Sequence, residues 1–249
     1  MLAATVALVG VALFLPRISQ PANYHNFADH RAWLGIPNFL DVVSNVPFAS
    51  IGLVGLVFLL RSDAAARFHD ARERWPYVVV LLGLLLTAFG SAYYHLAPDN
   101  ARLVWDRLPM TVTFMSLMAA VIAERISARL GFYLLLPLLA LGISSVLVWY
   151  ASELRGAGDL RFYAFIQAWG IVILPLAIWL SPARYTRSKD LLGAVGFYAL
   201  AKILETFDAR IFALGHIVGG HALKHLAAAM SGYWILRMLQ KRQLVSEAR

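Results

Sequence analysis

The chain has 249 residues, of which 60% are hydrophobic and only 14% charged, with a mean hydropathy of +0.67. This composition excludes an ordinary soluble domain and predicts an integral membrane protein. The formal charge of +8 does not indicate nucleic-acid binding, because the basic residues fall in short connections between apolar stretches. The absence of cysteine excludes disulfides, thiolate metal ligands and cysteine nucleophiles.

Apolar stretches long enough to cross a hydrocarbon core of about 30 Å recur along the chain and predict an all-α integral membrane protein. They are continuously apolar rather than alternating, which argues against membrane strands. We expect eight spans, at residues 2–16, 38–60, 76–97, 107–124, 131–150, 162–180, 190–212 and 214–236. For the first, a retained helix is favoured over a cleaved signal peptide, because no basic segment precedes it.

The spans divide the chain into three parts. Residues 1–21 are expected to form an N-terminal transmembrane helix or signal anchor, 22–237 a single transmembrane domain and 238–249 a basic tail. Lysine and arginine are concentrated in one set of alternate loops, which includes those around residues 61–74 and 184–189. The positive-inside rule places that set and the C-terminus in the cytoplasm.

Two histidines, His221 and His225, lie one helical turn apart in an apolar segment, where an unpaired imidazole is costly. An i, i+4 pair can supply two ligands to a tetrahedral metal, and His95 can supply a third from another span. The predicted orientation places all three toward the outer face. Three imidazoles and one water form the ligand set of a catalytic zinc ion, whereas packed polar groups bonded across helices are the alternative.

Ser91 lies four residues before His95, so both face the same side of a helix. Asp106 follows after a short connection, and an antiparallel hairpin would bring it beside a metal held by His95. There it can act as a general base toward water, while Ser91 donates to a developing oxyanion. The alternatives are a helix cap for Asp106 and a small packing residue for Ser91.

The combination Ser91-x3-His95, then Asp106, then His221-x3-His225 in the last span is similar to that of the alkaline ceramidases, within the CREST group of membrane hydrolases. Ser44 and Asn45 also resemble a signature of that family. The resemblance covers about residues 22–237 and implies a bacterial-type member with a seven-helix ceramidase-like bundle, to which residues 2–16 add a helix.

The resemblance implies a zinc-dependent amidase that cleaves the amide bond of ceramide or a related N-acyl lipid. His95, His221 and His225 would be the metal ligands, Asp106 would activate water and Ser91 would assist at the carbonyl. We expect the lipid to enter between helices near the outer interface.

Animal members of the family also bind calcium in an acidic N-terminal loop. Here the corresponding loop offers two carboxylates and three amide side chains: Asp29, Asp41, Asn23, Asn26 and Asn38. Calcium needs six to eight oxygen ligands, so a calcium site finds little support.

Two further features have structural interpretations. Lys202, Glu205 and Asp208 form one stripe of a helix and predict an internal charge pair, although Asp208 could instead orient a ligand histidine's ring. Trp149, near a span end, is interpreted as an interfacial anchor.

Two other classes of protein compete with the hydrolase. A membrane receptor or sensor could use a structural metal and a lipid-binding pocket. An ion or proton transporter would also carry histidines and acids within helices, but it would spread them through the membrane depth. Haem is disfavoured, because histidines on adjacent turns of one helix cannot occupy opposite haem faces.

Overall fold

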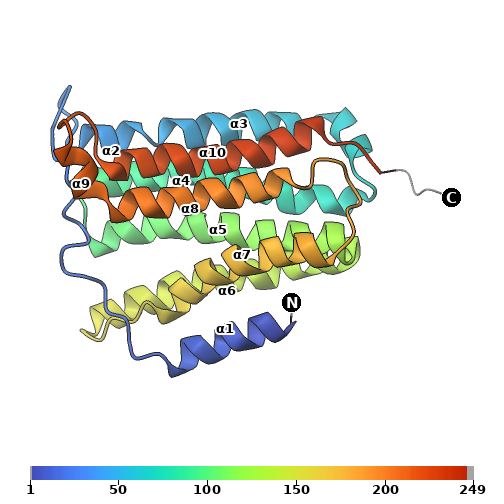
Figure 1. The fold of residues 1–249 in the computed structure, drawn as a ribbon, viewed down its shortest axis with the longest axis horizontal. Coiled ribbons are helices and arrows are strands. Elements are labelled where there is room, and N and C mark those ends of the chain that lie inside the picture. The colour runs from blue at the N-terminus through green and yellow to red at the C-terminus, as the bar shows by residue number, and fades with distance from the viewer. Residues whose placement is uncertain (1, 246–249) are drawn as a thin grey trace.

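The computed structural model describes residues 2–245 and folds most of them into helices packed side by side (Figure 1). The long helices are α3 (Val46–Leu60), α4 (Arg74–Leu96), α5 (Asn100–Arg125), α6 (Ala128–Leu154), α7 (Arg161–Leu180), α8 (Asp190–Thr206) and α10 (Gly220–Lys241). The shorter elements are α1 (Leu2–Phe14), α2 (Phe39–Val43), α9 (Asp208–Ala213) and the 3₁₀ turns η1 (Ser62–Arg67) and η2 (Ala71–Glu73). Within the described residues, extended pairing is limited to isolated bridges.

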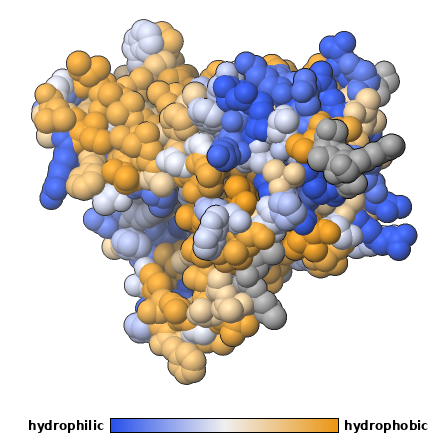
Figure 2. Space-filling model, turned by 45° about the vertical axis from the view of Figure 1, so that its right-hand side comes forward, coloured by the Kyte–Doolittle hydropathy of each residue, from blue (hydrophilic) through white to orange (hydrophobic). Residues whose placement is uncertain are grey.

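Five segments are long and apolar enough to cross a membrane, so the chain is an all-helical membrane protein as the composition predicts. They are Phe39–Leu60, Ala71–Leu96, Asn100–Arg125, Ala128–Leu154 and Arg161–Leu180. Figure 2 shows hydrophobic residues over much of the surface, with hydrophilic residues gathered toward one end. That distribution is typical of a bundle whose sides face lipid.

The expected count of eight spans is not confirmed. Helix α1 has 13 residues, so it extends only about 20 Å and is too short to cross a bilayer unaided. The span expected at 190–212 is interrupted at Phe207, between α8 and α9. The last helix begins at Gly220 rather than at residue 214. The expected span at 38–60 is present as the segment Phe39–Leu60, although a break within it separates α2 from α3.

The division between α2 and α3 has a local cause. The Asn45 side-chain amide donates to the Asp41 carbonyl oxygen (2.7 Å), and the Ser44 hydroxyl lies 3.2 Å from the same oxygen. Such side chains compete with the helical hydrogen bonds of the backbone. Pro47 follows in the first turn of α3, where its missing N–H costs little. Ser44 and Asn45, the two polar side chains at the break, therefore lie inside the bundle.

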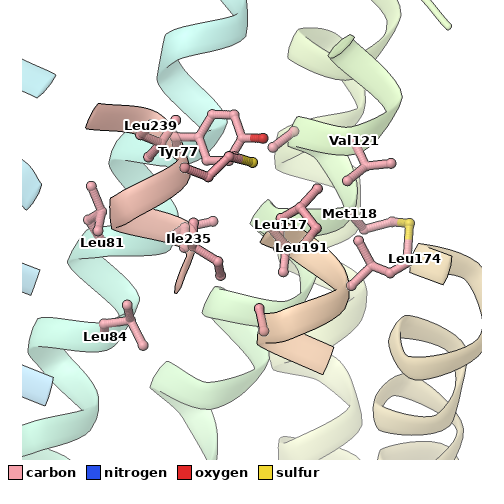
Figure 3. Close-up of a cluster of buried hydrophobic side chains, with 14 of the residues drawn as sticks. Tyr77, Leu81, Leu84, Leu117, Met118, Val121, Leu174, Leu191, Ile235 and Leu239 are labelled. Carbon is pink, nitrogen blue, oxygen red and sulfur yellow. The ribbon is translucent and has the colours of Figure 1, made fainter. Parts of the chain in front are cut away.

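A buried apolar cluster holds the helices together in the half of the bundle near the C-terminal end of α10 (Figure 3). Its labelled members come from α4, α5, α7, α8 and α10: Tyr77, Leu81, Leu84, Leu117, Met118, Val121, Leu174, Leu191, Ile235 and Leu239. Helices in lipid associate through close van der Waals packing, since lipid is as apolar as their side chains. A second, smaller apolar cluster, which includes Tyr94, Leu103 and Trp149, lies in the opposite half, where buried polar residues also gather.

Helices α4 and α5 form the expected antiparallel hairpin (Figure 1). The Asp99 carboxylate accepts a hydrogen bond from the Arg102 N–H (2.7 Å) and so caps α5. Asp106 is therefore not the cap; it lies in the second turn. Gly90 allows the close approach of the two helices, because a Cβ there would overlap the Trp105 carbonyl group.

We predict that Gly90→Ala lowers the thermal stability of the protein in detergent, by about 1–3 kcal/mol, because the added methyl forces α4 and α5 apart. Gly196→Ala is the matched control, since a Cβ at Gly196 meets no atom within 4 Å. It should be neutral or raise stability by up to about 1 kcal/mol through helix propensity. Equal melting temperatures for the two variants would contradict the assigned packing.

Candidate metal centre and cavity

Three histidines meet at one end of the bundle. His95 lies in the last turn of α4, and His221 and His225 lie in the first turns of α10, at the end where α2 and α9 are also found (Figure 1). Each side chain is at most 5% exposed. The structure thus brings together the three residues expected as metal ligands.

The geometry of the three rings fits a single metal ion. Their centroids form a nearly equilateral triangle with sides of 4.9, 4.9 and 5.0 Å. Imidazoles bound through nitrogens about 2.1 Å from one tetrahedral ion have centroids roughly 5 Å apart. One ring nitrogen from each residue lies within 4.8 Å of the others. Small ring rotations bring these nitrogens to the spacing of about 3.4 Å that tetrahedral coordination requires.

His95 supplies an independent indication of a metal. It is 0% exposed, and neither Nδ1 nor Nε2 has a hydrogen-bond partner among the described residues. Leaving buried polar atoms unsatisfied is costly, so such atoms require a ligand, a water or a functional reason. Its ring faces the other two histidines. This group of three can hold a metal ion.

Ser44 and Asn45 orient His225 from the break between α2 and α3. The Ser44 hydroxyl lies 2.8 Å from Nδ1 of His225, and the Asn45 amide nitrogen lies 3.5 Å from the same atom. A hydrogen bond at Nδ1 fixes the tautomer and leaves Nε2 as the ligand atom. The Ser-Asn signature therefore has a physical role beside the metal centre.

His221 has a cationic neighbour. The Lys224 ammonium group lies 2.9 Å from Nε2 of His221 and 3.0 Å from Glu205 Oε1. A metal bound through Nε2 would displace the lysine contact, whereas one bound through Nδ1 would preserve it. Glu205 also pairs with Lys202, so the expected charge pair forms, but the Lys202 side chain is 50% exposed and the pair is not internal.

Asp208 accepts hydrogen bonds from backbone N–H groups of the site. The alternative, in which it orients the ring of a ligand histidine, is not what the structure shows among the described residues. Its Oδ1 accepts from the N–H of His221 and its Oδ2 from the N–H of Ala28, both at 2.9 Å. Helix α10 passes too close for a side chain here, since a Cβ at Gly219 would lie 2.7 Å from Asp208 Oδ1. The glycine thus lets the ligand-bearing helix reach this acid.

The loop before α2 covers the three histidines. The Phe27 ring packs over His95 and His221, with centroids 4.7 and 4.3 Å away. Asp29 forms an ion pair with Arg31, which holds the pKa of Asp29 below its usual value, and Arg31 also donates to the Ile217 carbonyl oxygen (2.7 Å). These contacts tie the loop down, so that Phe27 shields the imidazoles from water.

Three of the five candidate calcium ligands, Asp29, Asn26 and Asn38, are engaged in other contacts, whereas both carboxylate oxygens of Asp41 are buried and have no hydrogen-bond partner among the described residues. Asp29 is paired with Arg31, and His30 lies 2.9 Å from Asn26 Oδ1 and 3.3 Å from Asn38 Oδ1. Asn38 also donates to the His95 carbonyl oxygen (2.9 Å), and thereby supports the metal centre. The loop does not form an oxygen cage, so calcium gains no support.

A cavity of about 290 Å³ extends from the metal centre into the bundle. At its polar end lie His225, Ser91 and Asp106, and the Ser91 side chain lies close to the Asp106 carboxylate. Both side chains are buried, with 1% and 8% exposure. The structure therefore places the two expected catalytic residues together beside a ligand histidine.

The other end of the cavity is apolar. Leu84, Leu117 and Ile235 line it from α4, α5 and α10. The cavity is also lined by Ala164 of α7 and Lys202 of α8, which are exposed at the surface of the bundle. A molecule with a polar group and an apolar chain fits this arrangement.

Trp149 differs from its interpretation as an interfacial anchor, because it is fully buried. The guanidinium carbon of Arg107 lies 4.0 Å from its ring centroid. Periodicity near a span end does not distinguish a tryptophan that faces lipid from one that faces the bundle. The structure alone reveals this pair.

No family model matches the chain, and no curated protein matches it significantly in sequence. The likeness to the alkaline ceramidases thus rests on the pattern of residues described above.

Sequence reasoning missed several residues of the site. Phe27 and Arg107 belong to no motif. Lys224 lies between His221 and His225 in the sequence, and its spacing alone does not mark it as part of the site. The adjacent Ser44, Asn45 and Pro47 could have been interpreted as a helix break, since this combination favours turns. Their contact with His225 depends on how α2 and α10 pack.

We predict that the purified protein binds one equivalent of a divalent metal and that His95→Ala reduces binding below detection, because two imidazoles from one helix make a weak site. His69→Ala, an exposed histidine at the opposite end, should keep the full equivalent. Metal content measured by mass spectrometry checks both. Retention of the metal in His95→Ala would contradict the assigned centre.

A second prediction concerns the hydrogen bond to His225. Ser44→Ala should weaken metal affinity by about 10- to 100-fold, the usual effect of losing a partner of a ligand imidazole. Ser50→Ala removes an exposed hydroxyl that bonds only the Val46 carbonyl of its own helix (3.2 Å), and it should leave the affinity unchanged. Competition with a chromogenic chelator measures both constants. An unchanged Ser44→Ala affinity would remove this serine from the site.

Proposed function

We propose that the protein is a zinc-dependent membrane hydrolase that cleaves the amide bond of ceramide or a related N-acyl lipid. The observation that carries the proposal is a group of three converging, buried imidazoles, of which His225 lines the polar end of an apolar cavity beside Asp106 and Ser91. Neither a structural metal site nor a packed polar cluster needs an acid and a hydroxyl at its open side.

Zinc is the metal that suits this ligand set best. Three neutral nitrogen ligands, with no thiolate in the chain, match catalytic zinc sites that keep a fourth position open. A zinc ion bound here would lower the pKa of water to about 7 and polarise a carbonyl group.

The protein's own residues perform the proton transfers. Asp106 accepts a proton from the water that attacks the carbonyl carbon, and it returns this proton to the nitrogen when the C–N bond breaks. Ser91 donates a hydrogen bond to the carbonyl oxygen as negative charge develops on it. The products are a fatty acid and the free amine. Phe27 keeps bulk water from the imidazoles, which strengthens these interactions.

The cavity suits a lipid. Eleven residues of α5 separate Asp106 from Leu117, a distance of about 16 Å along the helix axis. This is close to half of the roughly 30 Å hydrocarbon thickness, the depth that one acyl chain occupies in its leaflet. We place the acyl chain along α4, α5 and α10, with entry between α7 and α8 at Ala164 and Lys202.

We further propose that α8 and α10 cross the membrane together with the five apolar segments and complete a seven-helix bundle. Helix α8, with 17 residues, is shorter than the five apolar segments, and α10 carries the polar residues His221, Lys224 and His225, which accounts for the absence of both helices from that set. The concentration of basic residues at the opposite end favours a cytoplasmic C-terminus and a site near the outer face of a bacterial-type inner membrane.

Asp106→Asn should reduce release of fatty acid from N-acyl lipids by at least about 1,000-fold while retaining the metal, because the amide cannot accept the proton. Asp63→Asn, whose side chain is 73% exposed at the other end of the bundle, is the control and should keep full activity. Release from a panel of N-acyl lipids in nanodiscs is the measurement. If the zinc-loaded wild-type protein binds lipid but releases nothing, the chain is a receptor or sensor.

A further inference from the structure

Arg107 is a buried cation inside the bundle. It follows Asp106 in α5 and is 4% exposed. Its guanidinium carbon lies 4.0 Å from the ring centroid of Trp149, 4.7 Å from that of Tyr163 and 5.4 Å from that of Tyr24. Three aromatic rings from separate segments therefore hold this side chain in a fixed orientation.

Arg107 forms no ion pair with an acid within residues 2–245, although Asp106 lies near enough to interact with it electrostatically. Its hydrogen bond from Nη2 goes to a neutral acceptor, Gln20 Oε1 (2.8 Å), and it takes part in no ion pair among the described residues. Nη1 is buried and has no hydrogen-bond partner. A buried, unpaired charge is costly, and in a membrane protein it usually marks a functional site.

The cavity as a whole also carries an excess of positive charge. Its lining contains three cations, Arg107, Lys202 and Lys224, and two acids, Asp106 and Glu205. Both lysines bind Glu205, so this acid is fully used. Asp106 lies at the metal centre, where further positive charge would join it. Of the three cations in the lining, Arg107 is the one that forms no ion pair among the described residues.

We infer that the cavity takes an acyl lipid whose head group carries an anion, a carboxylate or a phosphate, that pairs with Arg107. The inference rests on the proposed function only where it assumes that the bound lipid is hydrolysed. The preference for an anionic head group follows from the charges that line the cavity. Arg107 adjoins the proposed base, so the anion belongs to the amine side of the scissile bond. A guanidinium group binds either anion well, because its N–H groups match planar carboxylate and phosphate oxygens.

The test uses lipids that cannot be hydrolysed, so that binding is separated from turnover. Dodecyl ethers that end in a carboxymethyl, a 2-phosphoethyl or a 2-hydroxyethyl group are titrated into the zinc-loaded wild-type protein in nanodiscs. At least one anionic ether should bind about tenfold or more tightly than the neutral one, with the difference shrinking at high salt. The tighter of the two anionic ethers identifies the carboxylate or the phosphate as the preferred head group.

Variants then assign the preference to Arg107. Arg107→Gln should bring the anionic and neutral ethers to within about twofold of each other, while Arg107→Lys keeps part of the difference. Arg102→Gln, on the same helix but outside the cavity lining, should behave as wild type. Equal binding of all ethers by the wild-type protein overturns the inference even if Arg107→Gln does not fold. An anionic preference that survives in Arg107→Gln overturns it as well.

The failures of the two proposals are distinguishable. Anion-selective binding without fatty-acid release from any amide would reject the hydrolase and keep the Arg107 site. Release from neutral amides, together with equal binding of the three ethers, would keep the hydrolase and reject the site.

Discussion

A ring nitrogen buried in a lipid-embedded bundle has no water to bond, so its partner must come from the protein or from a ligand. This constraint accounts for most of the polar architecture here. Ser44 satisfies His225, Lys224 satisfies His221, and both nitrogens of His95 are left over. The three imidazoles are held at one point by the break between α2 and α3, by the close approach at Gly219 and by the loop that carries Phe27.

The main apolar cluster and the three histidines lie in different halves of the bundle. The apolar cluster of α4, α5 and α10 lies in one half and fixes the helices through close packing. The three histidines and the polar end of the cavity lie in the other half, where Ser44 contacts His225 and Lys224 contacts His221. Rigid helices position catalytic groups more precisely than loops do, which suits a site that depends on angles between rings.

Positive charge is unevenly compensated around the cavity. Glu205 forms ion pairs with both Lys202 and Lys224, whereas Arg107 contacts aromatic rings and donates a hydrogen bond to a neutral amide. Such an arrangement maintains a cation in an apolar setting without supplying its counter-ion. The same cost of an unsatisfied buried group that distinguishes His95 applies to Arg107, and both residues have polar atoms without a hydrogen-bond partner among the described residues.

Composition and spacing by themselves determined the membrane class, the hairpin that brings Ser91 and His95 toward Asp106, and the choice of His95, His221 and His225, because apolar length and helical period are local properties of a sequence. The break at Ser44 follows from local side-chain hydrogen bonds to the Asp41 carbonyl oxygen, whereas the interruption after α8 places Asp208 against the His221 N–H, a contact that only the tertiary structure shows. Only the folded chain places Phe27 over the imidazoles and Arg107 on Trp149. These contacts join residues distant in sequence, and no periodicity encodes them.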